Sequence, residues 1–255
     1  GRYIARMDAD DLCYSERLAR QFDFLEKNPD YGLVGSRVDF PRHKSNQGYS
    51  HYVDWTNSLL GFEEIALHRF VESPFAHPSV MLRSALIKTY GAYQEGDFPE
   101  DYELWLRILQ NKVRMHKLAE PLLFWSDTPL RLSRTDRRYS IEAFYQVKAK
   151  YLSYWLRENN PFYPHVIIWG SGRTTRKRAE LLTYFSIRID AYVDIDPRKI
   201  GKYIDHKPVL APQDLPPAGQ CFVLSYVESR GAREDIQNRL QQLGYSLGKD
   251  FLLAA

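Results

Sequence analysis

Short apolar runs in the first 125 residues predict strands, and apolar residues at helical spacing between them predict helices. The expected strands are residues 3–7, 33–40, the end of 75–83, and one or two within 113–125. The expected helices are one between Ser15 and Asn28, one over about residues 58–70, and one that begins at Pro99. Polar stretches at residues 41–54 and 91–97 predict loops. The alternation indicates an α/β fold.

Helical spacing also predicts which side chains these helices bury. Leu18, Phe22 and Leu25 recur every three or four residues, and Ser15 stands where it could cap the start of their helix. Trp105 shares a helical face with two aliphatic residues, which favours a place in the core over a place in a binding pocket.

A second α/β unit is predicted after a linker. A long amphipathic helix with apolar residues between positions 141 and 155 cannot continue through residues 159–164, which hold two prolines and two asparagines. Strands and helices then alternate, which predicts a small parallel sheet. The expected elements are strands at 165–169, 189–193, 221–225 and 251–253, helices at 174–185 and 232–243, and a glycine turn at 170–172.

Charge and composition narrow the classes of function. A net charge of +3 over 255 residues is too small for a protein that binds nucleic-acid phosphates. Two cysteines without CxxC spacing indicate a reducing compartment, so we expect a cytoplasmic protein without a structural zinc site. No apolar run approaches the roughly 20 residues that span a bilayer.

Two acidic sites stand at the ends of predicted elements. Asp8, Asp10 and Asp11 place three carboxylates within four residues, and a divalent cation would relieve their repulsion. Glu100 and Asp101 fall in the first turn of the helix that begins near Pro99. Such acidic runs also cap helices, so the pattern alone leaves both readings open.

The residues around these sites resemble family 2 glycosyltransferases, which have a GT-A fold. The matching blocks cover roughly the first 125 residues and are residues 1–11 with the Asp-x-Asp pattern, Glu16-Arg17-Leu18 with Gln21, residues 77–81, and residues 99–107. The resemblance implies an inverting, metal-dependent transfer of a sugar from a nucleotide diphosphate donor, a UDP-sugar, to a hydroxyl group. The expected acceptor is a saccharide or lipid-linked saccharide in bacterial polysaccharide or glycoconjugate synthesis.

The resemblance also implies roles for single residues. Asp8 and Glu100 would contact substrate, Asp10 would bind Mn²⁺ or Mg²⁺, and Asp101 would be the catalytic base. His77 is a further expected substrate contact, although a histidine before proline is more often structural.

Four arginines precede the long helix and add a basic loop to this picture. They could hold a pyrophosphate or a lipid phosphate, which would bring the protein to the inner face of the membrane, or they could form a solvated loop. They are Arg131, Arg134, Arg137 and Arg138.

Members of this family carry a uridine-binding strand and helix pair ahead of the acidic motif, and this sequence shows no counterpart of it. The resemblance therefore predicts a fragment that is a poor enzyme alone. The expected organisation is the C-terminal part of a GT-A domain over residues 1–130, a helical connector over 131–162, and a Rossmann-like domain over 163–255.

The second domain carries an incomplete dinucleotide fingerprint. Gly170 and Gly172 follow a strand and open a helix, while Asp194 ends the next strand, where a ribose-binding acid would stand. Residues 193–201 and 207–210 are similar to the N-terminal domain of sugar O-acyltransferases. These features keep two alternatives open, namely an NAD(P)-dependent or nucleotide-binding protein and a non-catalytic binding module.

Overall fold

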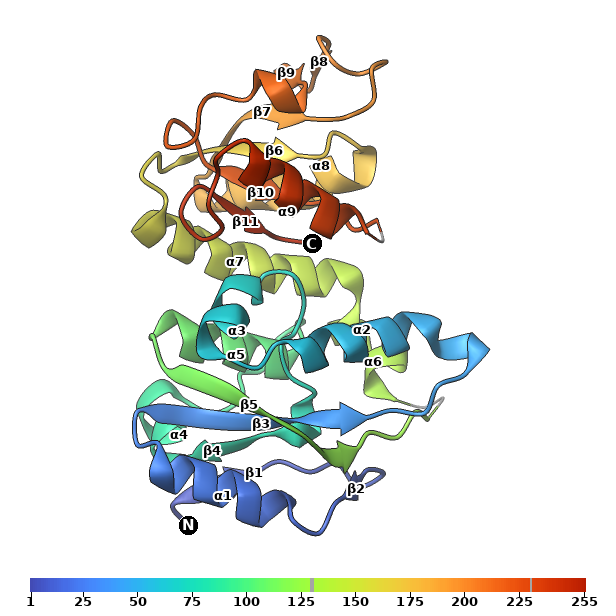
Figure 1. Cartoon of the computed structure of the whole chain (residues 1–255), viewed down its shortest axis with the longest axis vertical. Coiled ribbons are helices and arrows are strands. Elements are labelled where there is room, and N and C mark those ends of the chain that lie inside the picture. The colour runs from blue at the N-terminus through green and yellow to red at the C-terminus, as the bar shows by residue number, and fades with distance from the viewer. Residues whose placement is uncertain (129–130, 230) are drawn as a thin grey trace. The chain divides into compact units, whose positions relative to one another are not determined.

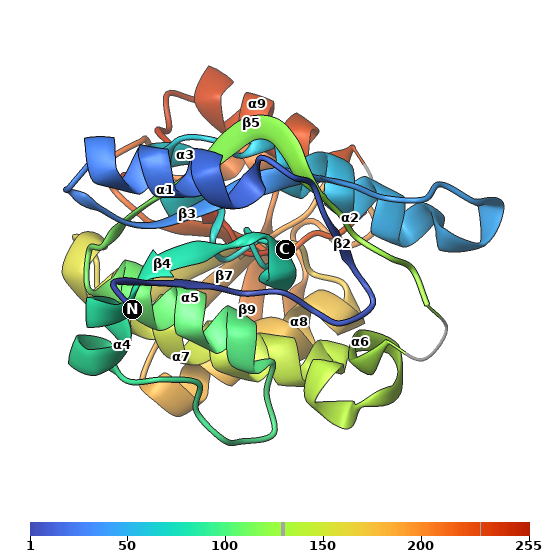
Figure 2. The same ribbon diagram turned by 90° about the horizontal axis from the view of Figure 1, so that it is seen from below.

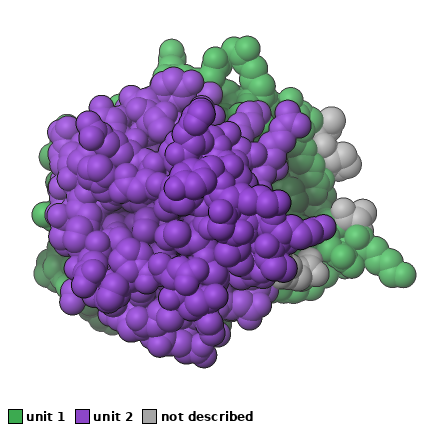
Figure 3. All heavy atoms as spheres, turned by 90° about the horizontal axis from the view of Figure 1, so that it is seen from above, with its two compact units in different colours: residues 1–69, 73–144 green, residues 70–72, 145–255 purple. Residues whose placement is uncertain are grey.

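The computed structural model describes residues 1–128, 131–229 and 231–255. The chain divides into two compact units, which are residues 1–69 with 73–144 and residues 70–72 with 145–255. Figure 3 colours them green and purple. The expected boundary at residue 130 falls outside the described residues, and the expected domain limits stay predictions.

Unit 1 is built on a five-stranded mixed sheet in the order β1-β4-β3-β5-β2 (Figure 1). The two long strands, β3 and β5, run parallel, whereas β4 is antiparallel to both β1 and β3, and β2 is antiparallel to β5. The strands are β1 (Tyr3–Ala5), β2 (Leu12–Cys13), β3 (Tyr31–Asp39), β4 (Met81–Arg83) and β5 (Arg114–Phe124).

Helices cover both faces of this sheet (Figures 1 and 2). On one face Leu25 of α1 packs against Val34 and Met81. On the other face Trp105 of α5 lies fully buried in a core cluster, as its spacing predicts. The helices of unit 1 are α1 (Arg17–Lys27), α2 (Gln47–Ser58), α3 (Phe62–His68), α4 (Ser84–Tyr90), α5 (Glu100–Gln110) and the short α6 (Leu132–Thr135).

The prediction of a loop over residues 41–54 is wrong, because most of this segment is helical. A 3-10 turn at Lys44–Asn46 leads directly into α2. The buried face of α2 consists of Ser50, Val53 and Thr56, and two of these three side chains are polar. Hydrophobic periodicity therefore gives almost no signal for this helix.

The predicted buried face of the first helix is confirmed at Leu25 and wrong at the other two positions. Leu18 and Phe22 are 52% and 39% exposed, while Arg17 and Gln21 are buried together with Leu25. The helix begins at Arg17, and no side chain caps it, so Ser15 does not have the expected role.

Arg17 and Gln21 are buried because their side chains hydrogen-bond backbone carbonyl groups of neighbouring segments. Arg17 Nη2 donates to the carbonyl oxygen of Arg6 at 2.7 Å. Gln21 Nε2 donates to the carbonyl oxygens of Ser79 at 2.7 Å and of Val34 at 3.2 Å. The helix thereby fixes the residues before the acidic turn and the loop before β4.

Unit 2 is built on a six-stranded sheet in the order β11-β10-β6-β7-β9-β8. All its neighbouring strands are parallel except β8 and β9. This agrees with the predicted Rossmann-like sheet, although β8 and β9 were not predicted. The strands are β6 (His165–Trp169), β7 (Arg188–Val193), β8 (Tyr203–Ile204), β9 (Lys207–Leu210), β10 (Val223–Ser225) and β11 (Phe251–Leu253), and the helices are α8 (Arg173–Glu180) and α9 (Ala232–Gln242). The long helix α7 (Ile141–Asn159) belongs to unit 2 from Tyr145 onwards.

We expect Gln21→Leu to lower the free energy of unfolding of unit 1 by about 1–3 kcal/mol, because two buried carbonyl groups lose their donor. Leu18→Gln is the matched control on the exposed face of α1 and should change stability by no more than about 0.5 kcal/mol. Urea denaturation of both variants measures the difference. A Gln21→Leu protein as stable as the wild type would contradict this account of the helix.

Candidate active site

The acidic turn that follows β1 holds its three carboxylates in different environments. Asp8 forms an ion pair with Arg6 at 2.6 Å, and the exposed Asp10 side chain has no hydrogen bond or ion pair within the described ranges. Asp11 is buried, and its Oδ1 accepts a hydrogen bond from the backbone N–H of Ser126 at 2.9 Å. Burial, opposed in part by this bond, raises the pKa of Asp11 to about 6.

Ser126 ties this turn to the end of β5. Besides its backbone bond to Asp11, its Oγ donates a hydrogen bond to the backbone carbonyl of Asp10. The backbone of Asp10 is therefore held in place, while its carboxylate stays exposed.

The second acidic site lies at the start of α5. Oδ1 of Asp101 is buried without a hydrogen-bond partner among the described residues. Burial, together with the neighbouring charge of Glu100, raises the pKa of Asp101 to about 7. Glu100 is fixed by Tyr139, whose Oη donates to its two carboxylate oxygens at 2.8 and 2.9 Å.

A pocket of about 640 Å³ opens beside the first turn of α5. It is lined by Arg6, His77, Tyr93, residues 94–97, Glu100 and Arg138. His77 Nε2 and Tyr93 Oη are 2.8 Å apart. Burial and the charge of Arg6 lower the pKa of His77 to about 4, so its ring is neutral at pH 7.

The charge of Asp8 links the two acidic sites. It raises the pKa of Asp101, and it acts in the same direction on His77. Because Asp8 acts on both groups, the acidic turn and the start of α5 belong to one electrostatic environment. Of the residues expected at the site, His77 and Glu100 line the pocket, while Asp8 and Asp101 lie within electrostatic range of each other.

The described residues contain no cluster of three or more His, Cys, Asp or Glu side chains that could hold a metal. Mg²⁺ and Mn²⁺ do not require such a cluster, because one or two carboxylates suffice when phosphate oxygens and water complete the octahedron. The exposed and unpaired carboxylate of Asp10 fits that donor chemistry.

Sequence comparisons relate part of the chain to known proteins. Residues 1–91 match the model of Glycosyl transferase family 2. These residues, apart from 70–72, make up the first part of unit 1 and a little over a third of the chain.

Among its curated relatives, an Escherichia coli UDP-Gal:alpha-D-GlcNAc-diphosphoundecaprenol beta-1,3-galactosyltransferase is 30% identical over 167 residues, which are 65% of this chain and 57% of that protein. The amylovoran biosynthesis glycosyltransferase AmsE of Erwinia amylovora is 33% identical over 42% of the chain and 38% of its own length. An uncharacterized glycosyltransferase of Methanocaldococcus jannaschii is 32% identical over 48% of the chain and 41% of its own length. The chain thus spans between about two fifths and three fifths of these relatives.

Three residues around the pocket do not follow from the sequence pattern. Arg6 and Tyr93 line the pocket, and Tyr139 orients Glu100. Tyr93 lies in the segment 91–97, for which the sequence predicts only a polar loop. An aromatic residue in a polar loop between two candidate site motifs is the signal that could have found it.

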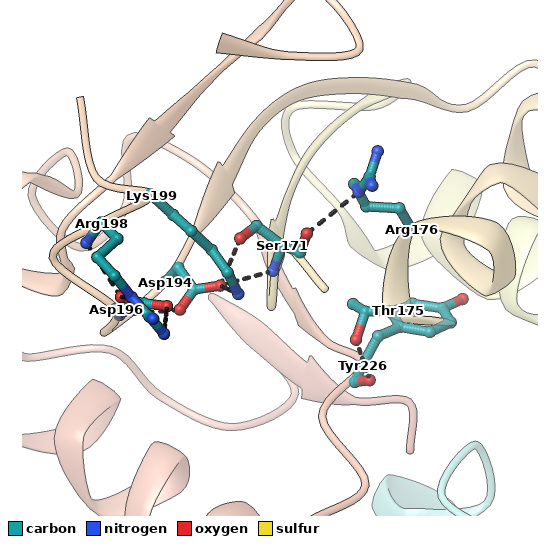
Figure 4. Close-up of polar contacts among 8 residues, drawn as sticks. All are labelled: Ser171, Thr175, Arg176, Asp194, Asp196, Arg198, Lys199 and Tyr226. Atoms are coloured by element: carbon teal, nitrogen blue, oxygen red, sulfur yellow. Dashed lines mark hydrogen bonds and ion pairs between the residues drawn. The ribbon is translucent and has the colours of Figure 1, made fainter. Parts of the chain in front are cut away.

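In unit 2 the glycine turn at residues 170–172 is hydrogen-bonded to Asp194. A Cβ on Gly170, whose φ is +110°, would stand 2.8 Å from Thr175 Cγ2, so this position requires glycine. Asp194 accepts hydrogen bonds from the N–H and the hydroxyl of Ser171 and from Lys199 (Figure 4). Although burial alone would raise the pKa of Asp194, these bonds lower it to about 2.

These contacts bear on the expected nucleotide site of unit 2. The backbone N–H of Asp196 also donates to Asp194, at 2.9 Å, so both carboxylate oxygens are engaged inside the unit (Figure 4). A ribose would have to displace these donors. Gly172 has an ordinary φ of −64°, and binding of a nucleotide by Gly170, Gly172 and Asp194 stays a prediction.

We expect the contribution of Asp101 to the free energy of unfolding to fall as the pH rises from about 4 to about 7, because the folded protein keeps the proton of Asp101 that the unfolded chain has lost. Asp101→Asn removes this contribution. At pH 8 the free energy of unfolding of the variant should be about 1–3 kcal/mol higher than that of the wild type. This difference should disappear as the pH falls towards about 4. Denaturant unfolding at several pH values measures it, with Asp97→Asn, whose side chain is 72% exposed, as the control. A difference that does not change with pH would contradict the raised pKa.

Proposed function

We propose that the protein is an inverting glycosyltransferase that moves a sugar from a nucleotide diphosphate donor to a hydroxyl group of a saccharide or lipid-linked saccharide. The observation that carries this proposal is the Asp101 carboxyl group, whose buried Oδ1 has no partner among the described residues, next in the chain to Glu100, which lines the pocket. The charge of Asp8 acts on this carboxyl group. The family match of residues 1–91 supports the reaction class.

In this proposal Asp101 is the catalytic base. The acceptor hydroxyl gives its proton to a carboxylate oxygen of Asp101 while its own oxygen bonds to the anomeric carbon, and the nucleotide diphosphate leaves from the opposite face. A carboxylate whose pKa is about 7 takes up this proton more readily than an ordinary one and is still partly ionised at neutral pH. Glu100, held by Tyr139, would contact the acceptor.

Asp10 would hold a divalent cation, Mn²⁺ or Mg²⁺, and Asp8 would contact the nucleotide sugar. The bound metal supplies Lewis-acid stabilisation of the departing diphosphate. Ser126 contributes by holding the backbone of Asp10, and Arg6 contributes by its ion pair with Asp8.

The named relatives support the choice of substrates. The name of the Escherichia coli relative specifies a UDP-sugar donor and a diphosphoundecaprenol-linked acceptor, and that of the Erwinia relative specifies the synthesis of a polysaccharide. We infer a UDP-sugar donor and a bacterial polysaccharide or glycoconjugate product, made in the cytoplasm at the inner face of the membrane. No helix in the described part of the chain is long and apolar enough to cross a bilayer.

We expect Asp101→Asn to lower kcat by about 10²- to 10⁴-fold, because the acceptor hydroxyl loses its proton acceptor. Binding of UDP in the presence of Mn²⁺ should stay within about twofold of the wild type, since Asp101 does not contact the donor in this mechanism. Release of UDP from a panel of UDP-sugars measures turnover, and calorimetry measures binding. The control is Asp23→Asn on α1, whose side chain is 62% exposed and lies outside the pocket lining. Normal turnover by Asp101→Asn would exclude Asp101 as the base.

A further inference from the structure

The basic segment after β5 contains three arginines with carboxylate partners and one without. Arg131 has no ion pair within the described ranges of the chain. The three paired arginines are Arg134 with Asp127 at 2.5 Å, Arg137 with Asp97 at 2.9 Å, and Arg138 with Asp136 at 2.7 Å. Among these four arginines, Arg131 is therefore the one whose charge has no carboxylate at ion-pair distance in the described part of the chain, although this charge acts on the carboxyl group of Asp11.

Aromatic side chains hold the Arg131 guanidinium in place. Its Cζ lies 4.0 Å from the ring centroid of Trp125 and 5.3 Å from that of Tyr49. Tyr49 is itself fixed by a 2.7 Å hydrogen bond between its Oη and Ser133 Oγ. A stacked guanidinium keeps its N–H groups in a fixed plane and is preorganised for a planar, two-oxygen ligand.

One nitrogen of this guanidinium lacks a partner. Nη1 of Arg131 is buried, and no described residue accepts a hydrogen bond from it. A buried donor without an acceptor costs free energy, which a ligand oxygen would recover. The orphaned nitrogen is thus a second observation, independent of charge, that indicates a missing acceptor.

The position of Arg131 relates this cation to the acidic turn. Ser126, five residues earlier, bonds both Asp10 and Asp11, and the charge of Arg131 acts on the carboxyl group of Asp11. Asn46 Nδ2 holds the intervening Asp127 at 2.7 Å. The segment therefore carries its unpaired cation close to the turn that ends in Asp10 and Asp11.

We propose that Arg131 binds the phosphate oxygens of a pyrophosphate group at the acidic turn. This inference rests on the proposed function, in which two substrates contain such a group, namely the nucleotide diphosphate donor and a lipid-diphosphate acceptor. A guanidinium binds phosphate oxygens through two parallel hydrogen bonds, which an ammonium group cannot reproduce. Arg131 would be a specificity-determining contact for a substrate that carries a diphosphate.

Calorimetric titration with inorganic pyrophosphate in the presence of Mg²⁺ tests this without any turnover. We expect Arg131→Gln to weaken pyrophosphate binding at least tenfold and Arg131→Lys to weaken it less. The lysine keeps the positive charge but cannot donate two parallel hydrogen bonds. Arg137→Gln is the matched control, since its side chain is 82% exposed and paired with Asp97. Unchanged unfolding midpoints would exclude loss of the fold as the cause.

Two further measurements, UDP binding and the KM for a lipid-diphosphate acceptor, identify which diphosphate is bound. Weaker UDP binding by Arg131→Gln assigns the contact to the donor, whereas unchanged UDP binding with a raised KM for a lipid-diphosphate acceptor assigns it to the acceptor. Absence of pyrophosphate binding by the wild type, or equal losses in Arg131→Gln and Arg137→Gln, would overturn the proposal. If pyrophosphate binds through Arg131 but no sugar is transferred, the proposed function fails while this site stands.

Discussion

The burial of the Asp101 carboxyl group beside other negative charges is the constraint on which the candidate site depends. Burial raises the pKa of Asp101 most, and the charges of the neighbouring Glu100 and of Asp8, from a distant part of the chain, raise it further. Arg6 offsets part of this charge through its ion pair with Asp8, and Asp101 responds with a raised pKa. A site that keeps such charges together is suited to accept a proton and to bind a cation with its phosphate ligand.

Polar side chains stand on the buried face of the first helix because they hydrogen-bond the backbone of neighbouring segments. Arg17 donates a hydrogen bond to the carbonyl group of Arg6, which precedes the acidic turn. Gln21 donates one to the carbonyl group of Ser79, which follows His77. An apolar helix face could pack against these segments, but it could not fix them to within a hydrogen bond. Precise placement of the turn relative to the pocket depends on these two residues.

The sequence predicts the features that depend on local pattern and leaves out those that depend on tertiary contacts. The strand at 165–169, the buried Trp105 and the acidic start of α5 follow from periodicity and helix-start signals. The helix α2 and the buried face of α1 do not, because their buried residues are polar and are satisfied only by distant carbonyl groups. Tyr93 joins the pocket through a contact with His77 that no spacing rule contains.

The account depends most on the shared environment of the acidic turn and the start of α5. A ¹³C NMR titration of the Asp101 carboxyl group measures this directly, in the wild type and in Asp8→Asn. We expect a pKa of about 7 that falls when Asp8 is neutralised, and no change when Asp190 in unit 2 is replaced by Asn. A pKa near 4 in the wild type, or one that does not respond to Asp8→Asn, would contradict the account.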